Sequence, residues 1–277
     1  MKRIFLSILF LFAFSIFVNG QNLNVLLIGD STTKGALPAT VHPERQQLKD
    51  MITTWFNANS AGKKLTVYNC SKGGESAKTI VSEGRYEQEV TPYKDMNIDI
   101  IIVRYGINDW FKCKDIDKDF PTDLDNLWKM LKKDFPKAKF IAQTITPFLK
   151  DNENERMNEH IKAVARRHKI AVNDIYTPFL KAMQKNGENN YWVRMAPLEN
   201  FPTKYHEMLK PYIGTTVKRG KKVQIVQVDD NSLDYFFIDP IKEFKGKNWE
   251  WVNHHPNSAG YSIVARETAE FLLENFD

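Results

Sequence analysis

The sequence predicts an α/β protein, a three-layer α/β/α sandwich built around a central parallel sheet. Short apolar runs rich in β-branched residues alternate with amphipathic segments of helical period. One of these runs, residues 98–104, is apolar on both faces for most of its length, which is typical of a central parallel strand. The chain has 277 residues, 42% of them hydrophobic and 26% charged, so it has the composition and length of a globular protein with a sizeable core.

The chain begins with the pattern of a secretory signal peptide. Lys2 and Arg3 precede an uncharged apolar run that ends at Val18, and Val18-Asn19-Gly20 offers small residues for cleavage. This run is about 15 residues long, short of the roughly 20 that a spanning helix needs. We expect residues 1–20 to be removed, leaving a periplasmic or secreted protein with no stable membrane anchor. The alternative is an uncleaved anchor.

Strand and helix patterns then follow one another along the chain. The first strand covers residues 25–28, and the helix at 43–59 has apolar residues at positions i, i+3, i+4, i+7 and i+8. A second strand is expected at 65–69 and a third at 98–104. The remaining predicted elements are a helix at 122–135, a strand at 139–144, a helix at 154–168, a strand at 170–174 and a last helix at 258–275, capped by Asn257 or Ser258.

The segment at about 187–248 interrupts this alternation with repeated prolines and many aromatic residues. Residues 222–228 have the alternation of a strand, and residues 236–238 are the expected hairpin partner across a turn at 229–232. We interpret the segment as an insertion or lid on a single domain at 21–277.

Three polar loops directly follow predicted strands. They are Gly29-Asp30-Ser31, Gly73-Gly74 and Gly106-Ile107-Asn108-Asp109. In a parallel sheet, ligands gather at the carboxyl ends of the strands. The three loops are therefore expected at one edge of the sheet.

Ser31, His255 and nearby amide donors are the groups that acyl transfer requires. A serine hydroxyl becomes a nucleophile when a neighbouring imidazole takes its proton. The oxyanion that forms then needs preorganised hydrogen-bond donors. The backbone amides of Ser31 and Gly74 and the side-chain amide of Asn108 could supply them, and glycine at position 74 allows close approach of the backbone.

In four blocks the sequence resembles the SGNH hydrolases, the GDSL-type esterase superfamily. The blocks are Gly29–Thr32, residues 69–76, Gly106–Asp109 and His255–Tyr261. The resemblance implies a flavodoxin-like fold over roughly 23–177 and 249–277, and a reaction that needs no metal or organic cofactor. It implies Ser31 as nucleophile, His255 as base and Asn108 as oxyanion donor, with Gly74 as the oxyanion glycine and Gly73 as the second choice.

Within the superfamily, the Gly-Asp-Ser-Thr block and Gly74-Glu75-Ser76-Ala77 are most similar to rhamnogalacturonan acetylesterases. This implies a carbohydrate esterase that removes O-acetyl groups from an acylated, pectic polysaccharide through an acyl-serine intermediate. One alternative is a lipase-like or thioesterase-like hydrolase of small acyl esters. The other is a non-catalytic glycan-binding protein on a degraded esterase fold.

The chain departs from the superfamily at the acid of the catalytic triad. The superfamily carries an aspartate three residues before the histidine, where this chain has Val252. Glu250 could reach the imidazole, an acid of the insertion such as Asp239 could take the place of the aspartate, or Ser31 and His255 could act as a dyad in which a backbone carbonyl holds the ring. We expect a dyad or a relocated acid, with Glu250 as the tentative acid, in an active enzyme.

The residues around these groups also have plainer interpretations. Asp30 and Asp109 are expected to support the loops of the site without acid–base work. His254 is the rival base, but the Pro-Asn-x-x-Gly-Tyr run aligns on His255. Four aromatic residues could stack on sugar rings or belong to the core: Trp110, Phe111, Tyr191 and Trp192.

The charge and the cysteine content give no indication of a nucleic-acid partner or of a zinc site. The net charge is +5 and falls to +3 once Lys2 and Arg3 are removed, too little to indicate a nucleic-acid partner. Cys70 and Cys113 are expected as two separate thiols in preference to a disulfide. Neither a CxxC pair nor a histidine-rich cluster indicates a zinc site.

Overall fold

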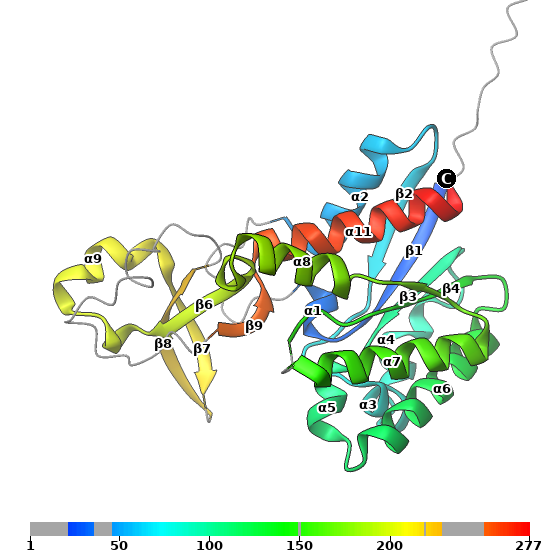
Figure 1. Cartoon of the computed structure of the whole chain (residues 1–277), viewed down its shortest axis with the longest axis horizontal. Coiled ribbons are helices and arrows are strands. Elements are labelled where there is room, and N and C mark those ends of the chain that lie inside the picture. The colour runs from blue at the N-terminus through cyan, green and yellow to red at the C-terminus, as the bar shows by residue number, and fades with distance from the viewer. Residues whose placement is uncertain (1–21, 36–45, 149–150, 219, 229–251) are drawn as a thin grey trace, which may run out of the picture.

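A five-stranded parallel sheet forms the centre of the molecule (Figure 1). The computed structural model describes residues 22–35, 46–148, 151–218, 220–228 and 252–277. The strand order is β2-β1-β3-β4-β5, and every neighbouring pair is parallel. The predicted α/β class is thus confirmed. The strands are β1 (Asn22–Gly29), β2 (Lys64–Asn69), β3 (Ile100–Arg104), β4 (Lys139–Gln143) and β5 (Ala171–Asn173).

Helices cover both faces of this sheet. The described helices are α1 (Ser31–Lys34), α2 (Leu48–Asn59), α3 (Ala77–Ser82), α4 (Arg85–Glu89), α5 (Ile107–Lys112), α6 (Ile116–Asp134), α7 (Asp151–His168), α8 (Tyr176–Asn186), α9 (His206–Leu209) and α11 (Ser258–Phe276). Alternate residues of β1 and β3 enter two separate cores, because successive side chains of a strand point to opposite faces. Val25 and Ile102 pack with α2, α8 and α11, whereas Leu26 and Ile101 pack with α3, α6 and α7.

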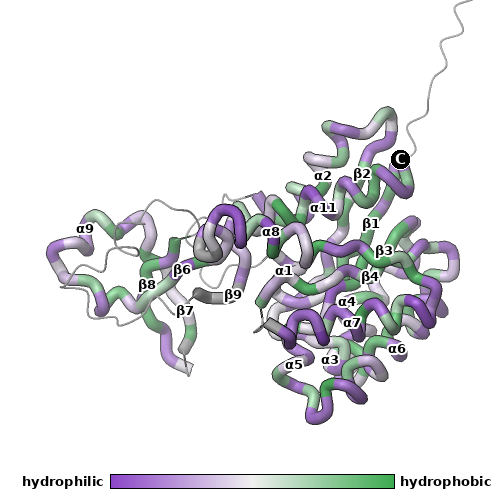
Figure 2. Tube along the Cα trace, viewed as in Figure 1, coloured by the Kyte–Doolittle hydropathy of each residue, from purple (hydrophilic) through white to green (hydrophobic). Residues whose placement is uncertain are grey.

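The distribution of hydropathy follows from this layering. Figure 2 shows hydrophobic residues along the central strands and hydrophilic residues recurring along α7, whose outer face meets solvent. Within the described residues, no helix combines the length and the apolar character that crossing a bilayer requires.

A second, antiparallel sheet extends from one end of this body (Figure 1). Its order is β7-β8-β6-β9, and its own small core includes Phe201, Leu209 and Val226. The strands are β6 (Trp192–Pro197), β7 (Ile213–Lys218), β8 (Lys221–Val228) and β9 (Val252–Pro256). Strands β6, β7 and β8 lie within the predicted insertion.

The partners of β8 differ from the predicted hairpin. The predicted strand is present, but β7 and β6 occupy its two edges, and residues 236–238 lie outside the described residues. Pro197 closes β6 and Pro211 precedes β7, so prolines that indicate loops in the sequence stand here at the ends of strands.

The starts of three helices differ from the prediction, and α7 begins at Asp151 ahead of the predicted 154. Helix α6 begins at Ile116, ahead of the predicted 122, because the Asp115 side chain accepts hydrogen bonds from the amides of Asp117 and Lys118 and caps the helix. For α2, residues 46 and 47 precede a helix that starts at Leu48, while 43–45 lie outside the described residues.

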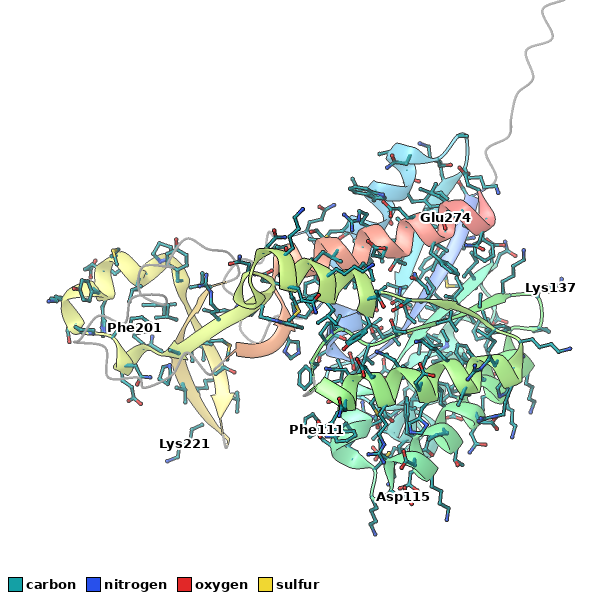
Figure 3. The ribbon with its side chains drawn as sticks, in the orientation of Figure 1. Phe111, Asp115, Lys137, Phe201, Lys221 and Glu274 are labelled. Carbon is teal, nitrogen blue, oxygen red and sulfur yellow. The ribbon has the colours of Figure 1, made fainter. Side chains whose placement is uncertain are left out.

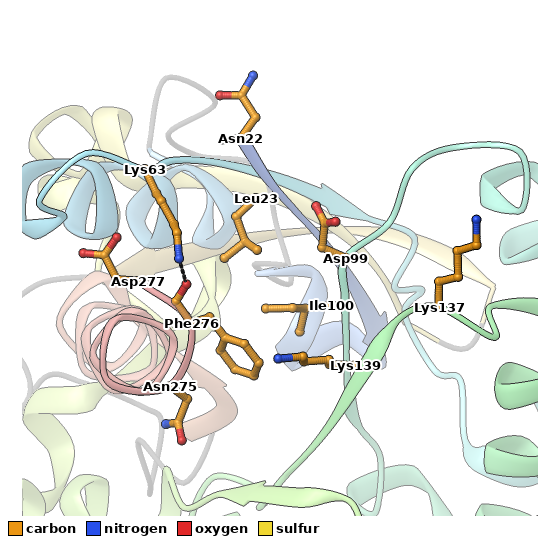
Figure 4. A pocket seen from close by; sticks show the side chains of 10 residues that line it. All are labelled: Asn22, Leu23, Lys63, Asp99, Ile100, Lys137, Lys139, Asn275, Phe276 and Asp277. Carbon is orange, nitrogen blue, oxygen red and sulfur yellow. Dashed lines mark hydrogen bonds between the residues drawn. The ribbon is translucent and has the colours of Figure 1, made fainter. Parts of the chain in front are cut away.

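Two cavities of about 450 Å³ each are lined by residues other than those of the predicted site. The first lies at the amino ends of β1, β3 and β4, where the Lys63 ammonium donates a hydrogen bond to the carbonyl of Phe276 (Figure 4). The second lies between α2 and α11 and is lined by residues such as Trp55 and Ile263. Neither is lined by Ser31, so neither marks the site described next.

Candidate active site

Ser31 and His255 meet at the carboxyl edge of the parallel sheet. Ser31 is the first residue of α1, directly after β1, which lies between β2 and β3 where the strand order reverses direction. His255 is on β9 just before α11. The Ser31 Oγ and the His255 Nε2 lie 2.8 Å apart, the geometry of a nucleophile and its base.

The turn that presents Ser31 is held by Asp30. The Asp30 Oδ1 accepts hydrogen bonds from the Thr32 amide at 2.8 Å and from the Thr32 hydroxyl at 2.7 Å, so Asp30 caps α1. Burial raises the pKa of Asp30, while the Thr32 hydrogen bonds and the charge of Arg104 lower it. Asp30 contacts the backbone of the turn, and His255 is the group that contacts the Ser31 hydroxyl.

A buried arginine that the sequence analysis did not single out supports the same turn. Arg104 donates to the Thr32 carbonyl at 2.7 Å, to the Thr33 hydroxyl at 3.0 Å and to Gln143 at 3.2 Å. Gln143 in turn donates to Thr268 of α11 at 2.7 Å. In the sequence, Arg104 ends the apolar run Ile-Ile-Ile-Val. That position indicates a buried cation, which needs hydrogen-bond partners of this kind.

The Gly73-Gly74 loop passes beside Ser31. A Cβ atom placed on Gly73 would lie 3.9 Å from the Cβ of Ser31, and Gly74 has a positive φ of 74°. Both glycines are exposed. Within the described part of the chain, the amides of Ser31 and Gly74 have no hydrogen-bond partner, so both are available to an incoming oxygen.

Asn108 reaches the site from α5. Gly106 makes the turn after β3 with a φ of 144°, and a Cβ atom there would lie only 2.9 Å from the Ile145 side chain. The Asn108 Nδ2 donates to the carbonyl of Glu75 at 2.8 Å. A side-chain amide nitrogen carries two hydrogens, so Asn108 retains a second donor.

Asp109 lies beneath this surface and is fully buried. Its carboxyl group faces the amides of Ala77 and Lys78 at the start of α3 without a close hydrogen bond to any described residue. Burial raises the pKa of Asp109 to about 7, the charge of Asp30 adds to this effect, and the amides of Lys78 and Ala77 oppose it. Asp109 therefore belongs to the packing of the loops.

This pKa predicts a pH-dependent stability that Asp109→Asn removes. Between about pH 4 and pH 7 the folded protein holds a proton on Asp109 that the unfolded chain has lost, so the free energy of unfolding decreases as the pH rises. The whole effect is at most about 4 kcal/mol. Thermal unfolding at about pH 5 and about pH 8 should show a smaller drop for the variant than for the wild type. Parallel pH profiles would contradict the assignment.

The described residues do not include every predicted member of the site. Glu250 and Asp239 lie outside them, as does the side chain of His254. Among the described residues, no group of three or more His, Cys, Asp or Glu side chains is arranged to hold a metal ion. Cys70 and Cys113 are separate thiols.

The four aromatic residues named above have different environments. Tyr191 and Trp192 are buried, and Trp110 is half-buried. Phe111 is 66% exposed, three residues after Asn108 on α5, and its ring makes an edge-to-face contact with Phe148 at 6.1 Å between centroids. Figure 3 shows Phe111 on the outside of the α/β body. Phe111 thus offers an aromatic surface to solvent near the site.

A parallel sheet with a serine–histidine pair and loop amides at its carboxyl edge defines a serine hydrolase. The chain belongs to the GDSL-like lipase/acylhydrolase family, whose model matches residues 27–194. It is therefore an esterase or acyl hydrolase. No curated protein sequence matches the chain.

Solved structures share this fold. One is an alpha/beta hydrolase enzyme from the metagenome of Lake Arreo, Spain, with a TM-score of 0.54 and 16% identity over 91% of this chain and 96% of that one. Another is an acetylxylan esterase from Geobacillus stearothermophilus, with a TM-score of 0.52 and 18% identity over 93% and 96% of the two chains. At these identities the likeness establishes the fold.

Proposed function

We propose that this protein is an exported serine esterase that removes O-acetyl or other short acyl groups from a carbohydrate. The observation that carries the proposal is the 2.8 Å contact between the Ser31 hydroxyl and the His255 imidazole beside open amide donors. That contact also favours an enzyme over a glycan-binding protein on a degraded site. The predicted signal peptide at 1–20 supports export.

The arrangement can carry out both halves of acyl transfer. His255 takes the proton of Ser31 as the hydroxyl oxygen attacks the ester carbonyl. The amides of Ser31, Gly74 and Asn108 receive the oxyanion, and the protonated His255 gives its proton to the sugar oxygen as its bond to the acyl carbon breaks. His255 then takes a proton from the water that attacks the acyl-serine, and it returns this proton to the Ser31 oxygen as the carboxylic acid leaves.

The imidazole needs a partner that holds its orientation. With Val252 in place of the usual aspartate, we propose that this partner is either a backbone carbonyl, in a Ser31–His255 dyad, or a relocated acid from Glu250 or Asp239. In either form His255 remains the proton carrier, because its Nε2 lies within hydrogen-bond distance of the Ser31 hydroxyl.

Three observations support a carbohydrate as the source of the acyl group. The segment Gly74–Ala77 resembles that of rhamnogalacturonan acetylesterases. A solved structure of the same fold is an acetylxylan esterase. An exposed Phe111 can stack on a sugar ring one helical turn from Asn108. A pectic polysaccharide is the substrate that the sequence resemblance favours, and acetylated xylan is the competing one.

Acetate release from acetylated xylan and from acetylated rhamnogalacturonan tests this proposal. We expect release from at least one polymer, and faster turnover of short than of long acyl p-nitrophenyl esters. A preference for long acyl chains, with no acetate released from either polymer, would favour the lipase-like alternative. The Ser31→Ala variant serves as the blank for both assays.

Phe111→Ala should weaken binding of acetylated oligosaccharides. The loss of one stacking contact worth about 1 kcal/mol should raise the KM for the oligosaccharide about 5-fold. The kinetics on ethyl acetate, which has no ring, should stay unchanged. Phe111→Trp should restore the lower KM. Val217 on β7 is also 66% exposed, so Val217→Ala is a matched control. An equal effect of Phe111→Ala on both esters would refute the stacking role.

A further inference from the structure

Glu75 is a buried carboxylate between two loops of the site. It directly follows Gly74 and is only 3% exposed. The Tyr105 hydroxyl donates to the Glu75 Oε2 at 3.0 Å, and the Asn108 Nδ2 donates to the Glu75 carbonyl at 2.8 Å. Tyr105 and Asn108 stand on either side of the turn at Gly106. One residue therefore holds both ends of the loop that carries Asn108.

The surroundings of this carboxylate do not explain it as a simple ion pair. Among the described residues the Glu75 Oε1 has no hydrogen-bond partner, and the Arg85 guanidinium is 4.0 Å away on a side chain that is 34% exposed. Burial raises the pKa of Glu75, and the Tyr105 hydrogen bond opposes that effect. Burying a carboxylate with a single hydrogen bond from a described side chain is costly, and an apolar side chain would be a less costly way to fill the space.

The Gly73-Gly74 loop has a second contact with α5, the helix that carries Asn108. The Lys112 ammonium on α5 donates to the carbonyl of Gly74, so α5 contacts this loop through both Asn108 and Lys112. The Glu75 amide also closes the turn by donating to the Lys72 carbonyl at 3.3 Å. Gly74 thus lies within a turn that the hydrogen bond between Glu75 and Lys72 closes, and Lys112 binds its carbonyl.

We propose that Glu75 is a positioning residue of the oxyanion site, whose carboxylate, held by Tyr105, sets the Gly74 amide and the Asn108 amide at a fixed separation. This inference rests on the proposed function. Oxyanion donors act when they already point at the position that the oxygen occupies in the transition state. A displacement of either donor therefore lowers kcat and leaves KM nearly unchanged.

The test compares Glu75→Ala, Glu75→Gln and Tyr105→Phe on p-nitrophenyl acetate. We expect Glu75→Ala and Tyr105→Phe to lower kcat about 10- to 100-fold with little change in KM. Glu75→Gln should retain most of the activity, because its amide oxygen still accepts from Tyr105. Glu83→Ala is a matched control, since Glu83 is an exposed glutamate at the end of α3.

A second measurement separates positioning from folding. An alkyl boronic acid that adds to Ser31 forms a tetrahedral adduct, and its affinity should fall in Glu75→Ala and Tyr105→Phe by about the factor seen in kcat/KM. A lower melting temperature with unchanged kcat and unchanged boronate affinity would overturn the inference. If Glu75→Ala does not fold, Tyr105→Phe, which removes a single hydroxyl, decides. Wild-type protein that neither hydrolyses the ester nor binds the boronate would instead overturn the proposed function.

Discussion

Ser31→Ala should abolish ester hydrolysis and leave the fold intact. The substitution removes one oxygen atom, whose described contact is the hydrogen bond with His255, and leaves the Asp30 cap of α1 in place. Loss of a nucleophile of this kind lowers kcat by about 10⁴-fold or more. Hydrolysis of p-nitrophenyl acetate measures the loss, and thermal unfolding verifies the fold. Residual activity near the wild-type level would refute the assignment of Ser31.

The same assay identifies the partner of the imidazole. His255→Ala should be as inactive as Ser31→Ala, and the double variant should be no worse than either, because the two groups act as a unit. A sharp decrease in Glu250→Gln would establish a relocated acid at that position. Unchanged activity in Glu250→Gln would leave a dyad or Asp239, which Asp239→Asn then distinguishes.

Asn108→Ala should lower kcat by about 10²- to 10³-fold with little change in KM. One hydrogen of the Asn108 amide is bound to the Glu75 carbonyl, which holds the side chain in place and leaves the second hydrogen for the oxyanion. Asn108→Asp keeps the size of the side chain but removes the N–H groups, so it should lose activity to a similar extent.

Asn275→Ala is the matched control for this prediction. The Asn275 side-chain amide on α11 also donates to a backbone carbonyl at 2.8 Å, but it lies at the amino edge of the sheet, beside the first cavity. Its replacement should leave kcat unchanged. A kcat within about 3-fold of the wild type in both Asn108 variants would remove Asn108 from the oxyanion site.

Periodicity explains why the parallel sheet could be predicted. Strands β1 and β3 are buried on both faces for most of their length, so they have the continuous apolar runs that the sequence shows at 25–28 and 100–103. Because the carboxyl ends of parallel strands share one edge of the sheet, the sequence alone predicts that Ser31, Gly74 and Asn108 lie together.

The missed features depend on contacts between distant parts of the chain. Strands β6 and β7 are short and have prolines at their ends, so their local patterns resemble loops. Pairing makes them strands: β7 pairs with β8, and β6 pairs with β8 and β9. The roles of Arg104 and Glu75 depend on hydrogen bonds with residues at least 30 positions away. Neither residue type indicates those partners by itself.

His255 lies on β9, at the opposite edge of the second sheet from β7. Pro256 and Asn257 follow His255 in the chain. The Asn257 side chain accepts a hydrogen bond from the Gly260 amide and donates one to the Asn190 carbonyl, so it anchors the start of α11. Strand β7 lies at the far edge of the second sheet, three places from β9. Substitutions on the exposed face of β7, such as Val217→Ala, should therefore leave the acyl-transfer apparatus unchanged.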